Sequence, residues 1–302
     1  MPVFPANDEF LASKAESFVD FHVWPLPTTF NPSGWLGNFL PAEQEHALNL
    51  LNAFIYYSPA MVDALFIAAF QQISSAVIDL GDSHVSAVEA WQRFCSTVMV
   101  VHVEGEEPNP TDSGYAYSRR ARQLLDIAES QVVTSRDALD RLLSGGPGAV
   151  VFVDDFVGSG SQFVTSWHRT WTLSDGREHS FAQLARTSSA RFYYCPLICT
   201  ASGFDAIRLD CPEVGVTPAH LLSPQYNLLS PDCHLWPEHL RGTAASFIEA
   251  ASRRAGIPEW GTSGWRGFHE LGLGIAWETS VPDATLPIFH WETNWQPLMR
   301  RR

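Results

Sequence analysis

The chain has 302 residues, of which 45% are hydrophobic and 17% are charged, a composition that supports a sizeable buried core and excludes a disordered protein. Its 19 basic residues against 33 acidic ones give a formal net charge of −14, which argues against general binding to a nucleic-acid backbone. Lys14 is the one lysine in the sequence. Bound phosphates would therefore have to be held by arginines, backbone N–H groups or a metal ion.

The start of the chain and its cysteines indicate a protein of a reducing compartment. No basic segment followed by an apolar one opens the sequence, and we find no apolar run of the roughly 18 residues that span a bilayer. The five cysteines are an odd number without C-x-x-C pairs, so free thiols are favoured over disulfides or a zinc site. They are Cys95, Cys195, Cys199, Cys211 and Cys233. We expect a cytoplasmic protein with no membrane segment.

Residues 1–95 have a helical pattern. The apolar residues Ala47, Leu50 and Leu51 fall on one helical face. Ser58 followed by Pro59 is typical of a helix start, and the apolar residues from 61 to 77 predict a helix buried on most sides. We interpret this part as an N-terminal helical cap.

Residues 96–217 alternate between strand and helix patterns. Four strands are predicted, at 97–103, 149–153, 192–200 and 214–216, and the helices between them include 115–129 and 137–143. The second strand is apolar on both faces, as in the centre of a parallel sheet. The expected fold class is therefore α/β, with a parallel sheet flanked by helices.

Residues 218–302 form an irregular C-terminal segment rich in Pro, Trp and His, which we expect to pack on the core as a hood. One helix is predicted over 238–255. The aromatic end, from Leu286 to Trp295, should be packed against the protein, while the three arginines from Arg300 onward should be solvated.

The segment from Val150 to Gln162 carries the strongest chemical signature. An apolar strand ends in two acids, and a turn of small residues and a helical pattern follow. Glycines allow a tight turn in which successive N–H groups and the helix N-terminus point at one anion, and the serines add hydroxyl donors. The acids can bind vicinal hydroxyls or hydrated Mg²⁺. We therefore predict a ribose 5-phosphate site made of Asp154, Asp155, Val157, Gly158, Ser159, Gly160, Ser161 and Gln162.

Other nucleotide motifs fit this segment less well. A Walker-type phosphate loop needs a lysine before Ser161, and the third glycine of a Rossmann fingerprint is replaced by Phe163. The strand also resembles the Mg²⁺-binding strand of ATPases, but the chain has no partner phosphate loop. An ordinary strand–turn–helix, whose acids cap the helix, stays open as the alternative without a ligand.

Residues 153–161, Val-Asp-Asp-Phe-Val-Gly-Ser-Gly-Ser, resemble the phosphoribosyl pyrophosphate (PRPP) motif of type I phosphoribosyltransferases. With the helical front and a Trp-rich C-terminal segment that ends in Pro297-Leu298-Met299-Arg300, the chain more narrowly resembles the PRTase-CE type, the phosphoribosyltransferase-like proteins of bacterial conflict systems. The resemblance implies a phosphoribosyltransferase-like fold. It also implies that Asp154 and Asp155 hold the ribose hydroxyls and Mg²⁺, directly or through water, while residues 158–162 hold the 5-phosphate.

By the same resemblance, the protein would bind PRPP or a nucleotide and act with partner proteins as an effector or regulator in anti-phage defence. It would be a glycosyltransferase of the phosphoribosyltransferase type, a non-catalytic nucleotide sensor, or a scaffold subunit. Catalysis would depend on placement and electrostatics, with no covalent nucleophile.

The loop at the family's pyrophosphate position departs from the pattern, because Glu104, Glu106 and Glu107 would repel pyrophosphate unless Mg²⁺ bridges them. Three arginines on the next predicted helix could supply positive charge or could form a solvated face. They are Arg119, Arg120 and Arg122.

Overall fold

The computed structural model describes residues 8–26, 28–79, 81, 83–105, 114–146, 148–261, 264–278 and 280–301. Their contacts group into two units. We call residues 62–222 the sheet unit, and residues up to 61 together with those from 223 onward the terminal unit. The division into three domains at 95/96 and 217/218 remains a prediction. These two units describe contacts and do not test which parts of the chain fold independently.

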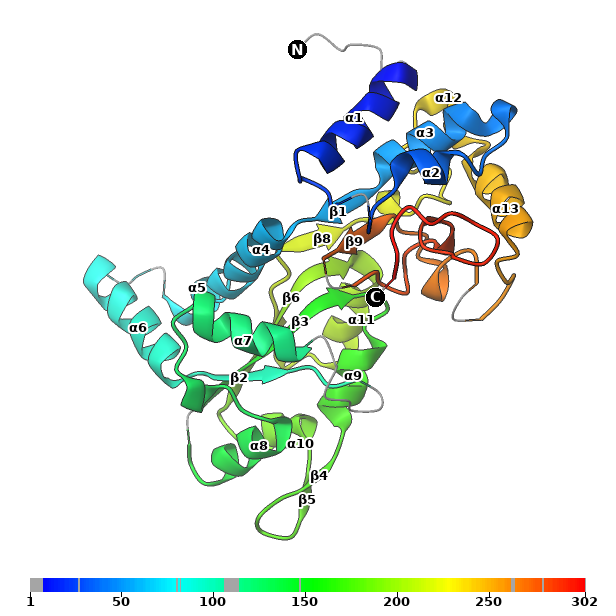
Figure 1. The fold of residues 1–302 in the computed structure, drawn as a ribbon. Helices are drawn as coiled ribbons and strands as arrows, with labels where there is room; N and C mark the ends of the chain where they lie inside the picture. Colours follow the sequence, from blue (N-terminus) through cyan, green and yellow to red (C-terminus); the bar gives the residue numbers. More distant parts are fainter. Residues whose placement is uncertain are drawn as a thin grey trace. The chain divides into compact units, whose positions relative to one another are not determined.

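The sheet unit is built on a parallel sheet (Figure 1). Its strand order is β2 (Met99–His102), β3 (Ala149–Val157), β6 (Arg191–Thr200) and β7 (Val214–Val216), and β8 (His220–Leu222) pairs with the end of β6. Each pairing is parallel. The four predicted strands are confirmed, and β3 is central between β2 and β6, as its apolar pattern predicts.

Helices cover both faces of this sheet, which confirms the α/β class. Successive strand residues point to opposite faces. Tyr194 stacks on Phe163 of α9 (Ser161–His168), with ring centroids 4.0 Å apart. Tyr193, its neighbour on β6, contacts Phe94 of α6 (His84–Thr97) at 5.8 Å.

The other helices of this unit join one of these two layers or connect them. On the side of Tyr194, the core includes residues of α8 (Ser135–Leu143), α10 (Phe181–Thr187) and α11 (Ala201–Asp210). On the other side, Phe66 of α4 (Pro59–Gln71) packs near Tyr117 of α7 (Gly114–Leu124). The short helix α5 (Ser74–Val77) follows α4.

Two local features of the sheet unit differ from the prediction. Helix α7 ends at Leu124 instead of 129, where Asp126 adopts a left-handed φ of 55° that a continuing helix does not allow. An antiparallel hairpin, β4 (Trp171–Thr172) with β5 (Glu178–His179), separates α9 from α10.

The helix that begins at Pro59 is one-sided, so the expectation that it is buried on most sides is wrong. Val62 and Phe66 are buried, whereas Met61 is 46% exposed. Among the described residues, the helical stretch Pro59–Val77 is also long and apolar enough to cross a membrane by length and composition alone, a test that the core helix of a soluble protein also passes. This corrects the expectation that no such run exists, because Asp63 is the single charge in it.

The terminal unit combines both ends of the chain. Strands β1 (Ile55–Tyr57) and β9 (Ile275–Trp277) pair in parallel, and the helices are α1 (Asp8–Asp20), α2 (Pro32–Leu36), α3 (Gln44–Ala53), α12 (Glu238–Arg241) and α13 (Ala244–Ala255). Trp35 stacks on Phe289 with ring centroids 5.6 Å apart. The aromatic C-terminal end is buried as predicted, whereas the predicted helix over 238–255 is two helices separated at 242–243.

Short 3₁₀ turns complete the described secondary structure, at Pro41–Glu43, Glu129–Gln131, Pro224–Tyr226, Phe268–Glu270 and Pro287–Phe289. The five cysteines are free thiols. Burial raises the pKa of Cys195 to about 12, so this thiol is not an activated nucleophile.

Candidate functional site

The loop singled out by the sequence lies at the carboxyl end of the central strand. β3 ends at Val157 and α9 begins at Ser161, so residues 158–160 form the turn between them. Gly158 and Ser159 are half-buried, and Ser161 and Gln162 are exposed. The carboxyl edge of a parallel sheet is where α/β proteins bind their ligands, so the loop occupies a suitable and accessible position.

Gly160 is required by both conformation and space. Its φ of 83° lies in the left-handed region, where a side chain is strained. A Cβ at this position would lie 2.9 Å from the carbonyl oxygen of Gly203 and 3.1 Å from Ile207 Cγ1. The turn is therefore held against α11 by a contact that a glycine alone permits.

Thr200 connects the turn to α11 and was not singled out by the sequence. Its hydroxyl donates a hydrogen bond of 2.5 Å to the carbonyl oxygen of Gly158 and accepts one of 3.0 Å from the N–H of Gly203. A Cβ on Gly203 would overlap the carbonyl oxygen of Gly158. Threonine is a preferred N-cap residue, and here the cap of α11 also fixes the loop.

Two serine hydroxyls lie next to each other at the start of α9. Ser159 Oγ and Ser161 Oγ are 2.9 Å apart, and the N–H of Ser161 donates to Ser159 Oγ at 3.4 Å. The first turn of a helix carries a partial positive charge from its N–H groups. The hydroxyl pair and this charge together suit a phosphate group.

The two acids at the end of β3 have different surroundings. Asp154 is 3% exposed, and both of its oxygens are engaged. Oδ1 accepts the N–H of Asp155 at 2.9 Å, and Oδ2 accepts the hydroxyl of Tyr194 at 3.0 Å. Burial, with the nearby charge of Asp155, raises the pKa of Asp154 well above its ordinary value. Asp154 is therefore a buried, hydrogen-bonded carboxyl on the side of α9.

Asp155 faces the opposite layer, as expected for the next residue on a strand. It is 8% exposed. Burial raises the pKa of Tyr117 on α7, and the nearby charge of Asp155 raises it further. The guanidinium of Arg120 lies 5.2 Å from the centroid of the Tyr117 ring. Asp155 therefore lies near Tyr117 of α7, on the face of the sheet opposite to α9.

Glu104, just beyond β2, is neutralised by a partner. Its carboxylate is 7% exposed and lies 3.3 Å from Nη1 of Arg169, and the hydroxyl of Ser135 donates to its Oε1 at 2.9 Å. Arg169 also donates to the carbonyl oxygen of Gly105 at 2.7 Å. Arg169, 65 residues away in sequence, therefore offsets the charge of Glu104 and reduces the repulsion expected from this carboxylate. Glu106 and Glu107 lie outside the described residues.

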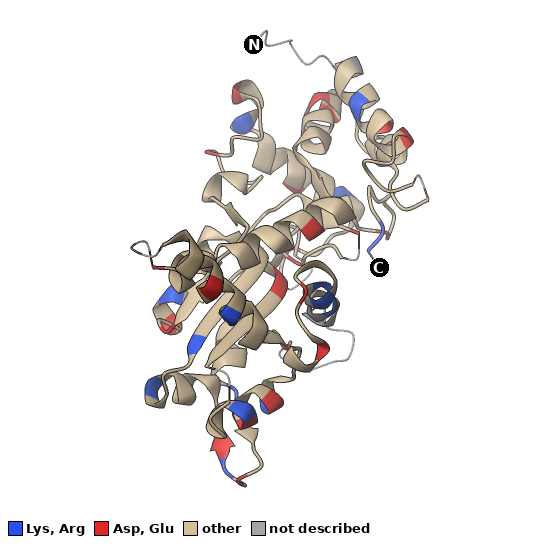
Figure 2. Ribbon diagram, turned by 90° about the vertical axis from the view of Figure 1, so that its left-hand side faces the viewer, with Lys and Arg blue, Asp and Glu red and all other residues tan. Residues whose placement is uncertain are grey.

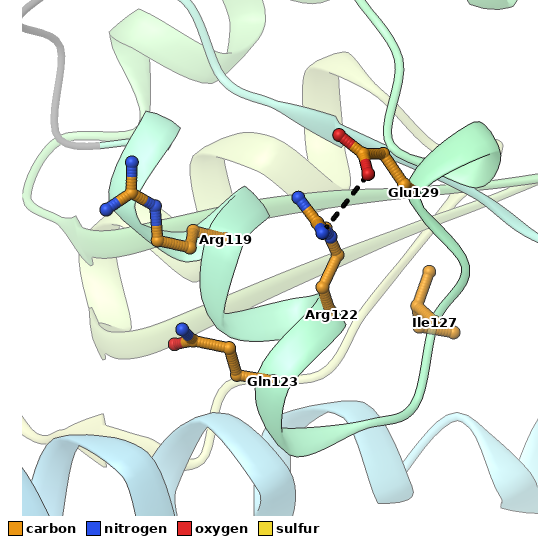
Figure 3. A pocket seen from close by; sticks show the side chains of 5 residues that line it. All are labelled: Arg119, Arg122, Gln123, Ile127 and Glu129. Atoms are coloured by element: carbon orange, nitrogen blue, oxygen red, sulfur yellow. Dashed lines mark ion pairs between the residues drawn. The ribbon is translucent and has the colours of Figure 1, made fainter.

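The three arginines of α7 do not converge on one point. Arg120 Nε lies 2.9 Å from Asp63 Oδ1, and Arg122 lies 3.2 Å from Glu129. Arg119, Arg122 and Glu129 line a cavity of about 600 Å³ with Gln123 and Ile127. Figure 3 shows Arg122 directed to Glu129, while Arg119 and Gln123 point away from Glu129. In Figure 2, basic residues are spread over several separate elements.

Among the residues that the structure describes, no group of three or more His, Cys, Asp or Glu side chains could hold a metal ion. Mg²⁺ commonly uses one or two carboxylates, with phosphate oxygens and water as its other ligands. Asp154 and Asp155, just before the turn, could supply such a minor share of the ligands, and each oxygen of Asp154 already accepts one hydrogen bond.

A family model described as PRTase-CE matches residues 32–301 of the chain. The match includes the whole sheet unit and nearly all of the described terminal unit from α2 onward. No curated protein matches the chain in sequence.

Proposed function

Because the chain belongs to the PRTase-CE family and is phosphoribosyltransferase-like, we propose that it binds PRPP, or a nucleotide with a ribose 5-phosphate, at residues 154–162. One observation carries this proposal. The left-handed Gly160, packed on Gly203, holds two adjacent serine hydroxyls and the start of α9 at the carboxyl edge of the central strand. Such a turn suits a terminal phosphate, and the carboxylates just before it suit the sugar hydroxyls.

The two acids then have different roles. Asp155 binds the ribose hydroxyls and contributes to holding Mg²⁺. Asp154 keeps the end of β3 in place through Tyr194 and the N–H of Asp155. The residues from Val157 to Gln162 bind the 5-phosphate. Mg²⁺, when bound, neutralises negative charge on the pyrophosphate.

If PRPP is turned over, the protein is a glycosyltransferase. The bond from the anomeric carbon to pyrophosphate breaks, positive charge develops on the ribose, and an acceptor takes the place of pyrophosphate. The carboxylate of Asp155 stabilises this positive charge, and the phosphate turn holds the sugar in position.

Calorimetric titration with PRPP and with ribose 5-phosphate tests the site. Asp155→Asn should weaken binding by about 1.5 to 3 kcal/mol, roughly 10- to 150-fold, because a charged acceptor is lost. Asp210→Asn, a matched change at the exposed end of α11, should leave the affinity unchanged. Equal affinity of the wild type and Asp155→Asn would contradict the role of Asp155.

The metal is tested in the same titration. We expect PRPP to bind much more tightly with millimolar Mg²⁺ than with EDTA, because the ion offsets repulsion between pyrophosphate and the carboxylates. Ribose 5-phosphate should depend less on the ion. Equal PRPP affinity in both conditions would contradict a pyrophosphate subsite.

The paired state of Glu104 favours a second candidate, a nucleotide sensor without turnover. Just beyond β2, the carboxylate of Glu104 pairs with Arg169, and Arg169 also donates to the carbonyl oxygen of Gly105. Its guanidinium is therefore already bound to protein groups at the position where pyrophosphate would need a hydrogen-bond donor. Release of pyrophosphate from PRPP separates the two functions. Binding without release favours the sensor, and release favours the transferase.

The family resemblance also leads us to propose that the protein acts in the cytoplasm, with partner proteins, as an effector or regulator of anti-phage defence. Plating of phages on cells that express the protein with its neighbouring genes tests this role. Protection that is lost with Asp155→Asn and kept with Asp210→Asn would support it, and no protection with the wild type would count against it.

A further inference from the structure

The terminal unit contains a cavity of about 250 Å³ that shares no residue with the phosphate turn. Its walls are mostly apolar and come from α1, α3, β1, the start of α4 and the segments that follow α1 and α3. They include Phe18, Trp24, Leu51 and Phe54. Phe18, which lies on α1, and Trp24 precede residue 32, where the family match begins. The cavity therefore depends on a part of the chain that the family model does not include.

The one lysine of the protein lies in the wall of this cavity. The ammonium of Lys14 donates a hydrogen bond of 2.5 Å to Oδ1 of Asn52 and lies 5.5 Å from the centroid of the Phe18 ring. In the described part of the chain, no carboxylate forms an ion pair with it. Burial lowers the pKa of Lys14, so its ammonium has lost part of its hydration. A partly desolvated cation with no counter-ion is stabilised by an anion placed beside it.

Apolar side chains at this cavity are also left in contact with solvent. Val23 is 48% exposed and Met61 is 46% exposed, although both line the cavity. Large exposed apolar residues around a hollow mark a binding surface more often than scattered ones do. An apolar ligand would remove their side chains from water.

We propose that this cavity binds a small amphiphile, an apolar chain or ring that ends in a carboxylate. The apolar part lies among Phe18, Trp24 and Phe54, and the carboxylate accepts a hydrogen bond from Lys14. A cavity of about 150 Å³ is enough to bind benzene, so 250 Å³ admits a ring or short chain together with its carboxylate.

Lys14 makes a direct test possible, because reductive methylation with ¹³C-formaldehyde labels this side chain and the chain's N-terminus as the only two amines. Octanoate is the probe, and 1-octanol is its uncharged control. Octanoate should shift the Lys14 methyl signal and bind at least tenfold more tightly than 1-octanol, as measured by calorimetry. Lys14→Met keeps the apolar stem and should bring the two affinities together.

Arg300→Gln is the matched control, since it removes an exposed cation of the same unit outside the cavity. It should leave the preference for octanoate unchanged. Ala15→Leu fills the cavity from α1 and should weaken both ligands, with thermal unfolding as the check that the variant folds. Equal affinity of the wild type for octanoate and 1-octanol, binding of neither, or a preference kept in Lys14→Met would overturn the proposal. PRPP binding is measured separately, so either result leaves the proposed function to its own test.

Discussion

The hydroxyl of Tyr194 on β6 donates a 3.0 Å hydrogen bond to Oδ2 of Asp154 on β3, so a fully buried phenol holds a nearly buried carboxyl. The Tyr194 ring stacks on Phe163 of α9 at 4.0 Å, which places the hydroxyl. Asp154, the first of the two acids in the motif, is therefore held in place by a residue of the neighbouring strand β6.

Tyr194→Phe should lower the free energy of unfolding by about 1 to 3 kcal/mol, because Oδ2 of Asp154 loses its donor inside the protein. Urea unfolding measures this loss. Tyr193→Phe, the same change on the opposite face of the sheet, should cost less, because burial is smaller around the Tyr193 hydroxyl. Equal losses for the two variants would show that the bond to Asp154 does not contribute specifically.

Asp154→Asn should change how stability depends on pH. Burial and the charge of Asp155 raise the pKa of Asp154 in the folded protein above its ordinary value of 3.8. A raised folded pKa means that the folded state binds the proton more strongly, so this group's contribution to stability falls as the pH rises from 3.8 toward the folded pKa. Asparagine does not titrate, and it keeps an acceptor for the N–H of Asp155 and gains a donor for Tyr194.

We therefore expect the stability of Asp154→Asn relative to the wild type to increase as the pH rises, and to level off above the folded pKa. Urea unfolding from about pH 4 to about pH 8 measures this difference. A difference that stays constant over this range would show that Asp154 titrates normally.

Gly160→Ala should impair both stability and phosphate binding. Gly160 and Gly176 have similar left-handed φ values, 83° and 78°, so alanine costs about 1 to 2 kcal/mol at either position. A Cβ at Gly176 meets nothing within 4 Å, whereas one at Gly160 presses on Gly203. Gly160→Ala should thus lose more stability than Gly176→Ala, and it alone should weaken ribose 5-phosphate binding. Equal ribose 5-phosphate affinity of the two variants would show that the turn at Gly160 does not bind the phosphate.

Glu104→Gln tests the buried ion pair. Breaking a buried pair leaves an uncompensated charge and costs about 3 to 5 kcal/mol, whereas an exposed pair contributes about 0 to 1 kcal/mol. The side chains of Glu104 and Arg169 are 7% and 18% exposed, against 78% and 45% for Glu129 and Arg122. Glu104→Gln should therefore destabilise the protein more than Glu129→Gln in the same unfolding measurement. The reverse order would mean that the glutamine amide oxygen satisfies Arg169 as well as the carboxylate does.

The sheet could be predicted because its strands are apolar on both faces. The run from Ala149 to Val153 indicates a central parallel strand, and the acids and glycines that follow it place the turn at its carboxyl end. The three residues of β1 carry no comparable pattern. Ile55–Tyr57 is a strand because it pairs with β9, more than two hundred residues later, and local sequence contains no information on such a partner.

The same limit applies within the site. The motif identifies Asp154, but the hydroxyl that holds it comes from Tyr194, 40 residues away. The sequence likewise does not show that Glu104, just after β2, pairs with Arg169, because Arg169 follows α9, 65 residues later. The residues of the turn are contiguous and can be identified from the sequence, whereas the contacts that hold its acids come from distant segments.

The pairing of β1 with β9 also fixes an order of events during translation. Tyr57 is in register with Trp277, so at about 5 to 20 residues per second the ribosome takes about 10 to 45 s to deliver the second strand after the first. The ring centroids of Phe54 and Phe289 lie 4.8 Å apart, so Phe54 also lacks this contact until Phe289 has been synthesised. The sheet unit is continuous in sequence and is synthesised within this delay. Nascent chains therefore expose the apolar residues of the N-terminal helices until the last part of the chain emerges, and that interval is when they most need protection by a chaperone.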